Sequence, residues 1–142
     1  MPRASNEILI DRPRDDVFAF LADPRNDPLW RSGVLDLTRV SGEGVGARYA
    51  QGVKGPGGRR IAADIEITEL TPSQTIAFKT VAGPVRPRGR YVLAVADAKT
   101  HVRFELEADT RGLKRLIAPM VQKTMNDEVS QLAQLKHLLE AR

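Results

Sequence analysis

Residues 113–140 read LKRLIAPMVQKTMNDEVSQLAQLKHLLE, and this C-terminal stretch decides the fold. Its apolar residues recur at helical spacing, while charged and amide side chains take the opposite side, which predicts one long amphipathic helix. Such a helix is a rod of roughly 40 Å, longer than an average globular helix. Pro119 removes one backbone donor, so we expect a kink or a break there. A long helix that closes a chain of strands indicates a sheet that grips it around a cavity.

The composition is that of a single soluble domain, residues 1–142, with 42% hydrophobic and 28% charged residues. No apolar run approaches a membrane span, and residues 1–7 lack the apolar segment of a signal peptide. With no cysteine, neither disulfides nor thiolate chemistry are available, and we expect a cytoplasmic location. The net charge of +4 is spread along the chain. We therefore predict no nucleic-acid partner and no stable membrane insertion, and leave the oligomeric state open.

The part of the chain before the long helix is predicted to form one strand, two short helices and six further strands. Residues 6–10 are the first strand, and Pro13 begins a helix that Asp23 and Pro24 end. Residues 25–29 add another helical turn. The later strands, separated by turn signals rich in glycine, proline and aspartate, are expected at 34–40, 47–53, 60–70, 75–81, 88–96 and 100–108.

Apolar and polar residues alternate most clearly in the last of these strands, where Val102, Phe104 and Leu106 oppose Arg103 and Glu105. This alternation is typical of an antiparallel sheet that is covered on one face only. The same parity predicts the other inward-facing residues. They are Tyr49, Gln51, Val53, Ile61, Ala63, Ile65, Ile67, Ile76, Phe78, Thr80, Tyr91, Leu93 and Val95.

The stretch IDRPRDDVFAFLADP at 10–24, followed by Trp30, resembles the opening of the START-like (SRPBCC, Bet v 1-like) superfamily. The motifs GVG at 44–46, ELTP at 69–72, YVL at 91–93 and LKHLLE at 135–140 continue the match in order. The resemblance covers about residues 6–141 and is greatest to the bacterial polyketide cyclase/dehydrase-like branch. It implies an α+β helix-grip fold. In this fold a curved, seven-stranded antiparallel sheet and a long C-terminal helix enclose a hydrophobic pocket, with two short helices after strand 1.

A pocket of this kind would be lined by inward residues of the sheet, the helical corner and the last helix. Tyr49 and Tyr91 offer phenol hydroxyls, and Trp30 would cap one end. The complete set of candidate ligand-binding residues is Phe20, Trp30, Tyr49, Gln51, Ile65, Ile67, Phe78, Thr80, Tyr91, Leu93, Phe104, Leu106, Ile117, Met120, Val121, Thr124, Met125 and Glu128.

Glu128 is the best candidate for a catalytic residue, because it falls near the middle of the apolar face of the helix. In one interpretation it lies in the pocket with Thr124, faces Tyr49 or Tyr91, and binds a ligand carbonyl or transfers a proton. In the other it is solvated, or it pairs with a basic side chain for structure. The sequence leaves both open.

Other constellations do not predict a site. His101 and His137 are far apart and have no ligand spacing, so we predict no metal. The glycine-rich segments 41–46 and 55–58 lie between strands and lack the end of a P-loop, so they are hairpin turns. Arg86 and Arg88 remain candidates for the rim of the pocket.

The leading functional hypothesis is binding of a hydrophobic or amphipathic small molecule, lipid-like or polyketide-like, in an internal cavity. The second is a cyclase, dehydratase or isomerase that uses a pocket carboxylate or tyrosine as acid or base. The third is a protein- or membrane-interaction module, motivated by the basic charge. A buried carboxylate near a phenol would favour the enzyme, whereas an exposed apolar patch with a basic surround would favour the interaction module. No organic cofactor is implied.

Overall fold

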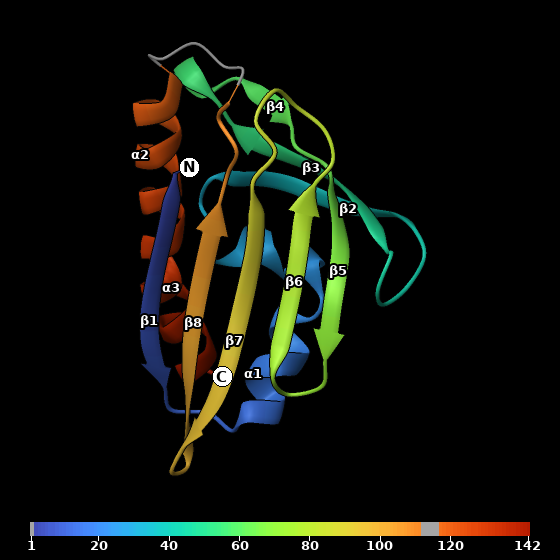
Figure 1. Cartoon of the computed structure of the whole chain (residues 1–142). Helices are drawn as coiled ribbons and strands as arrows, with labels where there is room; N and C mark the ends of the chain where they lie inside the picture. The colour runs from blue at the N-terminus through green and yellow to red at the C-terminus, as the bar shows by residue number, and fades with distance from the viewer. Residues whose placement is uncertain (1, 112–116) are drawn as a thin grey trace.

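The computed structural model describes residues 2–111 and 117–142 of the chain (Figure 1). The strands are β1 (Arg3–Ile10), β2 (Val34–Ser41), β3 (Arg48–Lys54), β4 (Arg60–Ala62), β5 (Ile65–Thr71), β6 (Thr75–Thr80), β7 (Arg88–Ala96) and β8 (Lys99–Glu107). The helices are α1 (Arg14–Leu21), α2 (Ile117–Ser130) and α3 (Leu132–Glu140), with short 3-10 helices η1 (Pro24–Leu29) and η2 (Pro56–Gly58). The predicted order of elements is confirmed, and β1 begins three residues earlier than expected.

All strands belong to one antiparallel sheet in the order β1-β8-β7-β6-β5-β3-β2, with the short β4 paired to β3. The first and last strands are neighbours along their whole length, from Arg3 opposite Glu107 to Ile10 opposite Thr100. Seven strands follow the main path, and the helix-grip fold implied by the family resemblance is thereby confirmed. At the other edge, β2 carries two irregularities in its pairing with β3, one near each end of the strand.

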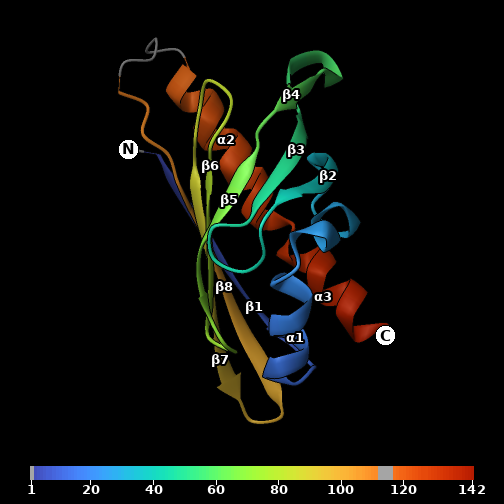
Figure 2. The same cartoon turned by 90° about the vertical axis from the view of Figure 1, so that its right-hand side faces the viewer.

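The helices cover one face of this sheet. Figures 1 and 2 show α2 and α3 crossing it, with α1 beside the lower half. α2 contacts β1 and β8, α3 contacts β1, and α1 contacts β7 and β8. The core therefore lies between the inner face of the sheet and the helices.

The alternation pattern correctly predicts most of this core. Phe104, Leu106 and Tyr91 are buried, and Arg103 stands on the outer face. Four of the predicted inward residues depart from the pattern. Val95 is 61% exposed, because it lies beside the β7–β8 hairpin. Val53, Ile61 and Ala63 are only half-buried. The predicted strand 60–70 is divided into β4 and β5, and Val53 pairs with Ile61 of the short β4.

The C-terminal helix differs from the prediction in the position of its break. α2 runs without interruption through Pro119, the third residue of its described length, where a proline costs little. The interruption falls at Gln131, whose N–H bonds to the carbonyl of Glu128 at 3.1 Å in a tighter, 3-10-type turn. Residues 113–116, which we expected to begin the helix and to form part of a gate, lie outside the described residues.

Candidate functional site

The helical corner after β1 directs three large side chains into the interior. The carboxylate of Asp23 accepts a hydrogen bond from the Arg25 N–H at 3.1 Å and caps η1. The N–H groups of Trp30 and Arg31 then both bond to the carbonyl of Asp27, at 3.1 and 2.8 Å. This tight turn brings Asp27, Trp30 and Arg31 together, and all three are buried.

Arg31 is the centre of a buried ionic cluster, the Asp27–Arg31–Glu128 triad. Its Nη1 donates to Oδ2 of Asp27 at 2.9 Å, and its Nε donates to Oε2 of Glu128 at 3.0 Å. The side chains of Arg31, Asp27 and Glu128 are 5%, 6% and 15% exposed. A side chain on Gly33 would meet the Glu128 carboxylate, since a Cβ there would lie 3.0 Å from Oε1. The triad thus ties the helical corner to the middle of the C-terminal helices.

Four aromatic rings pack beside the triad. The rings of Tyr91 and Phe104 are stacked with centroids 4.4 Å apart, and Trp30 meets both edge-on at 6.1 Å. Phe78 lies 6.2 Å from Tyr91, and the Arg31 guanidinium sits over its face at 5.8 Å. The charged triad and the aromatic rings therefore form one contiguous site.

Three buried polar atoms have no hydrogen-bond partner in the described part of the chain. They are Trp30 Nε1, Tyr91 Oη and Gln51 Oε1. Two of the three are donors in the aromatic cluster. Gln51 uses its amide nitrogen to donate to the Ala63 carbonyl at 3.0 Å, which leaves its oxygen free to accept. Buried polar groups are almost always paired, so these three are the most unusual feature of the interior.

Burial sets the ionisation of the site. It raises the pKa of Asp27 to about 6 in spite of the charge on Arg31, and the neighbouring Glu128 carboxylate adds to the rise. It also raises the pKa of Tyr91 well above its usual value, reinforced by Asp27. Burial opposes the charge on Arg31, but the surrounding carboxylates raise its pKa overall. Tyr91 is therefore a neutral hydrogen-bond donor, and Asp27 can exchange a proton near neutral pH.

The structure places most predicted site residues on the inner side. Those that are buried are Phe20, Trp30, Tyr49, Gln51, Ile65, Ile67, Phe78, Thr80, Tyr91, Leu93, Phe104, Leu106 and Met125. Ile117, Val121 and Glu128 are partly buried. Met120, at 58%, and Thr124 are exposed, because α2 packs against β1 and β8 and these two residues lie off the packed side. Their prediction as inward-facing residues was wrong.

Glu128 meets a basic partner rather than a phenol, as one of its two sequence interpretations has it. Neither Arg31 nor Glu128 is among the main groups that act on the pKa of Tyr49. After burial, the groups that act on its pKa are Asp23, Arg39, Arg25 and Glu43.

Sequence reasoning missed Asp27 and Arg31. The available signal was an acid and a base four residues apart on either side of Trp30. That spacing is also common in exposed helical ion pairs, so it does not by itself indicate burial.

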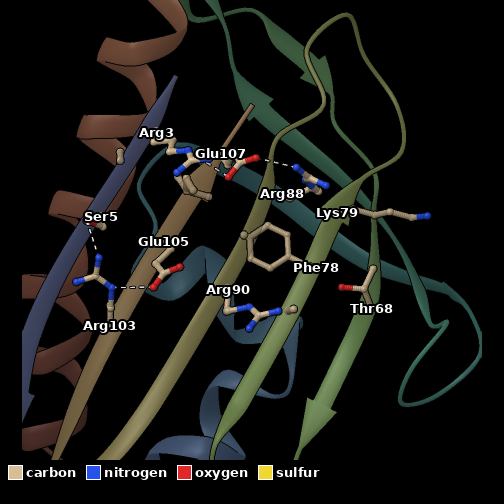
Figure 3. Close-up of a pocket in the computed structure, with 14 residues that line it drawn as sticks. Arg3, Ser5, Thr68, Phe78, Lys79, Arg88, Arg90, Arg103, Glu105 and Glu107 are labelled. Atoms are coloured by element: carbon tan, nitrogen blue, oxygen red, sulfur yellow. Dashed lines mark hydrogen bonds and ion pairs between the residues drawn. The ribbon is translucent and has the colours of Figure 1, made fainter. Parts of the chain in front are cut away.

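The outer face of the sheet holds a hollow of about 580 Å³, on the side away from the triad (Figure 3). Its charged side chains form ion pairs with one another or with neighbouring carboxylates. Arg88 bonds to Glu107 at 2.8 Å and Arg103 to Glu105 at 2.7 Å. Arg88 thus belongs to this outer network rather than to the rim of an interior pocket, while Arg86 is exposed and donates to the Gly83 carbonyl. A cavity between the sheet and α2 stays a prediction.

Within residues 2–111 and 117–142, no group of three or more His, Cys, Asp or Glu side chains is arranged to hold a metal ion. His101 lies 3.8 Å from Glu7 on the outer side. None of the described helices is both long and apolar enough to span a membrane.

Comparisons with family models and with solved structures agree with this fold. The family described as "Polyketide cyclase / dehydrase and lipid transport" matches residues 1–140. Among solved structures, the di-domain ARO/CYC BexL from the BE-7585A biosynthetic pathway has 24% identity and a TM-score of 0.78, over 99% of this chain and 47% of that protein. Ara h 8.0201 has 12% identity and a TM-score of 0.77, over 99% and 98% of the two chains. A START superfamily protein from Mycobacterium smegmatis has 11% identity and a TM-score of 0.73, over 96% and 98%. No curated protein sequence is significantly similar to this chain.

Proposed function

Because the chain belongs to the polyketide cyclase/dehydrase and lipid transport family, we propose that it binds a hydrophobic or amphipathic small molecule between the sheet and α2. The observation that carries this proposal is a pair of buried donors, Trp30 Nε1 and Tyr91 Oη, that find no acceptor among the described residues. Each such group costs about 1–3 kcal/mol when it is left unpaired. An oxygen atom of a bound molecule would supply the missing acceptor, and the aromatic rings around it would contact an apolar body.

The beginning of α2 supports a route of entry. Met120 and Thr124 precede Glu128 by two turns and one turn on the same side of the helix. Along this line the side chains change from exposed to largely buried. A ligand could pass along this line toward the triad, with Ile117 and Val121 as half-buried apolar contacts.

The test is a titration with Nile red, an uncharged dye whose emission rises in apolar surroundings. We expect saturable binding by the native protein. Replacing Phe104, fully buried against Trp30 and Tyr91, by Trp should weaken dye binding more than it lowers the free energy of unfolding. Val95→Trp on the exposed hairpin is the control and should change neither. Absence of saturable binding, or equal loss of binding and stability in Phe104→Trp, would indicate a filled core and contradict the proposal.

A cyclisation or dehydration reaction is the second candidate, favoured by one observation: the Asp27 carboxylate and the Tyr91 phenol are both buried, and the charge of Asp27 acts on the pKa of Tyr91. Asp27, with a pKa of about 6, could take a proton from a carbon beside a ligand carbonyl, while neutral Tyr91 donates a hydrogen bond to the developing enolate oxygen. Incubation with a poly-β-ketone thioester and analysis of the products by mass spectrometry tests this. Product formation should be lost in Asp27→Asn and retained in Asp127→Asn, whose carboxylate is exposed on α2. Unchanged turnover in Asp27→Asn would contradict it.

A further inference from the structure

The triad holds more negative than positive charge. Two carboxylates, on Asp27 and Glu128, share the single guanidinium of Arg31. With both carboxylates ionised, the site carries one uncompensated negative charge. The three side chains are at most 15% exposed, so water screens this charge poorly.

The triad is rich in hydrogen-bond acceptors, whereas the unpaired groups beside it are hydrogen-bond donors. Trp30 Nε1 and Tyr91 Oη are both donors, and each lacks an acceptor in the described part of the chain. The site therefore needs an oxygen that accepts hydrogen bonds, but residues 2–111 and 117–142 place no free positive charge beside it to balance an anion. A ketone or ester oxygen meets both conditions, whereas a carboxylate, sulfonate or phosphate meets only the first.

Resting on the proposed function, we propose that the site selects an uncharged molecule with a ketone or ester oxygen, excludes anionic amphiphiles, and admits anions when Asp27 is protonated. The groups that face Asp27 are Arg31 and Asp23 from the helical corner and Glu128 from α2, with the Tyr91 phenol of β7 beside them. Protonation of Asp27 leaves one carboxylate for one guanidinium, and the triad becomes neutral. Since burial raises the pKa of Asp27 to about 6, this change falls in an accessible pH range.

The experiment compares two chains of equal length, 2-nonanone and 1-nonanesulfonate, at about pH 7.5 and about pH 5. The sulfonate stays charged at both values, so a change with pH reports on the protein. Trp30 is the only tryptophan and lies at the site, so its fluorescence follows binding. We expect the ketone to bind equally at both pH values. The sulfonate should bind at least about tenfold more weakly than the ketone at the higher pH, with a smaller difference at the lower pH.

Charge-removing variants make the inference specific to the triad. Asp27→Asn should raise sulfonate affinity at about pH 7.5 to the low-pH value and abolish its pH dependence. Glu128→Gln removes the same charge from the other side and serves if Asp27→Asn fails to fold. Asp127→Asn, one residue away with its side chain 65% exposed, is the matched control and should behave like the native protein.

The outcomes separate the two levels of the proposal. If the sulfonate binds as tightly as the ketone at about pH 7.5, the selectivity is refuted while ligand binding stands. If neither triad variant changes sulfonate affinity more than Asp127→Asn does, the triad is not its cause, and the inference is overturned. If neither molecule alters the fluorescence at either pH, the proposed function itself fails.

Discussion

Replacement of Arg31 by Met is the sharpest test of the buried triad. The change removes the guanidinium that both carboxylates share and leaves an apolar side chain of similar length. Removing one partner of a buried ion pair costs about 3–5 kcal/mol, because an uncompensated charge remains in the interior. For a chain of 142 residues this corresponds to a fall in melting temperature of about 10–17 °C.

The loss should also depend on pH, in a direction that the structure fixes. Without Arg31, burial favours the neutral form of Asp27 even more strongly, so the pKa of this carboxyl in the folded protein rises further above its unfolded value of about 3.9. The folded state then tolerates the change best in acid, where the carboxyl is protonated, and it loses stability as the pH rises through the raised pKa. We therefore expect a larger destabilisation at about pH 7.5 than at about pH 5.

Urea denaturation at the two pH values measures the effect, with Arg60→Met as the matched control. Arg60 also forms a short pair, 2.7 Å from Asp36, but the two side chains are 49% and 50% exposed. An exposed pair is worth about 0–1 kcal/mol, so Arg60→Met should cost little at either pH. Equal losses in both variants, or a loss in Arg31→Met that does not change with pH, would refute this reasoning. The triple variant Asp27→Asn, Arg31→Met, Glu128→Gln should recover most of the stability.

Three further measurements follow from the same interior. Tyr91→Phe removes a hydroxyl that has no partner in residues 2–111 and 117–142, so urea denaturation should show unchanged or slightly higher stability, by up to about 1 kcal/mol, while 2-nonanone binds more weakly. A clear loss of stability would mean that the hydroxyl is paired. In the native protein the pKa of Asp27 is about 6, above its unfolded value, so its contribution to stability is complete below about pH 4 and is lost as the pH rises through 6. Asp27→Asn should flatten this part of the plot of unfolding free energy against pH. An unaltered plot would contradict the raised pKa of Asp27. Hydrogen exchange should be faster in the first half of α2 than in α3. In α2 Met120 and Thr124 are exposed, whereas α3 buries Leu132, Leu135 and Leu139. Uniform protection along both helices would argue against this difference.

Local patterns predicted most of the fold, because a sheet with one dry face imposes its period on the sequence. In β8, Val102, Phe104 and Leu106 must alternate with residues such as Arg103, and only one register satisfies them. The position of a helix interruption is harder to predict from local sequence. Pro119 has the stronger intrinsic tendency to break a helix, yet the break occurs at Gln131, a residue with no such tendency. Beside it, the Ser32 hydroxyl contacts the Gln131 amide oxygen at 3.2 Å, a tertiary contact that local sequence does not reveal.

The site could be predicted only in part, for a related reason. Glu128 attracted attention because a carboxylate in an apolar helix face requires an explanation. Its partner Arg31 lies 97 residues earlier, beyond the reach of any spacing rule. The unpaired atoms of Trp30 and Tyr91 are likewise invisible in the sequence, because both residue types are ordinary members of a core.

The two edges of the sheet also decide how the protein behaves when it is concentrated. An exposed strand edge attracts strands of other molecules, and these would start aggregates. α2 and α3 pack along β1 at one edge. At the opposite edge, the two pairing irregularities confine the regular part of β2 to residues 36–39, with charged Asp36 and Arg39 at its limits. A regular edge this short and this charged disfavours pairing with a strand of another molecule, so this edge resists growth by strand addition.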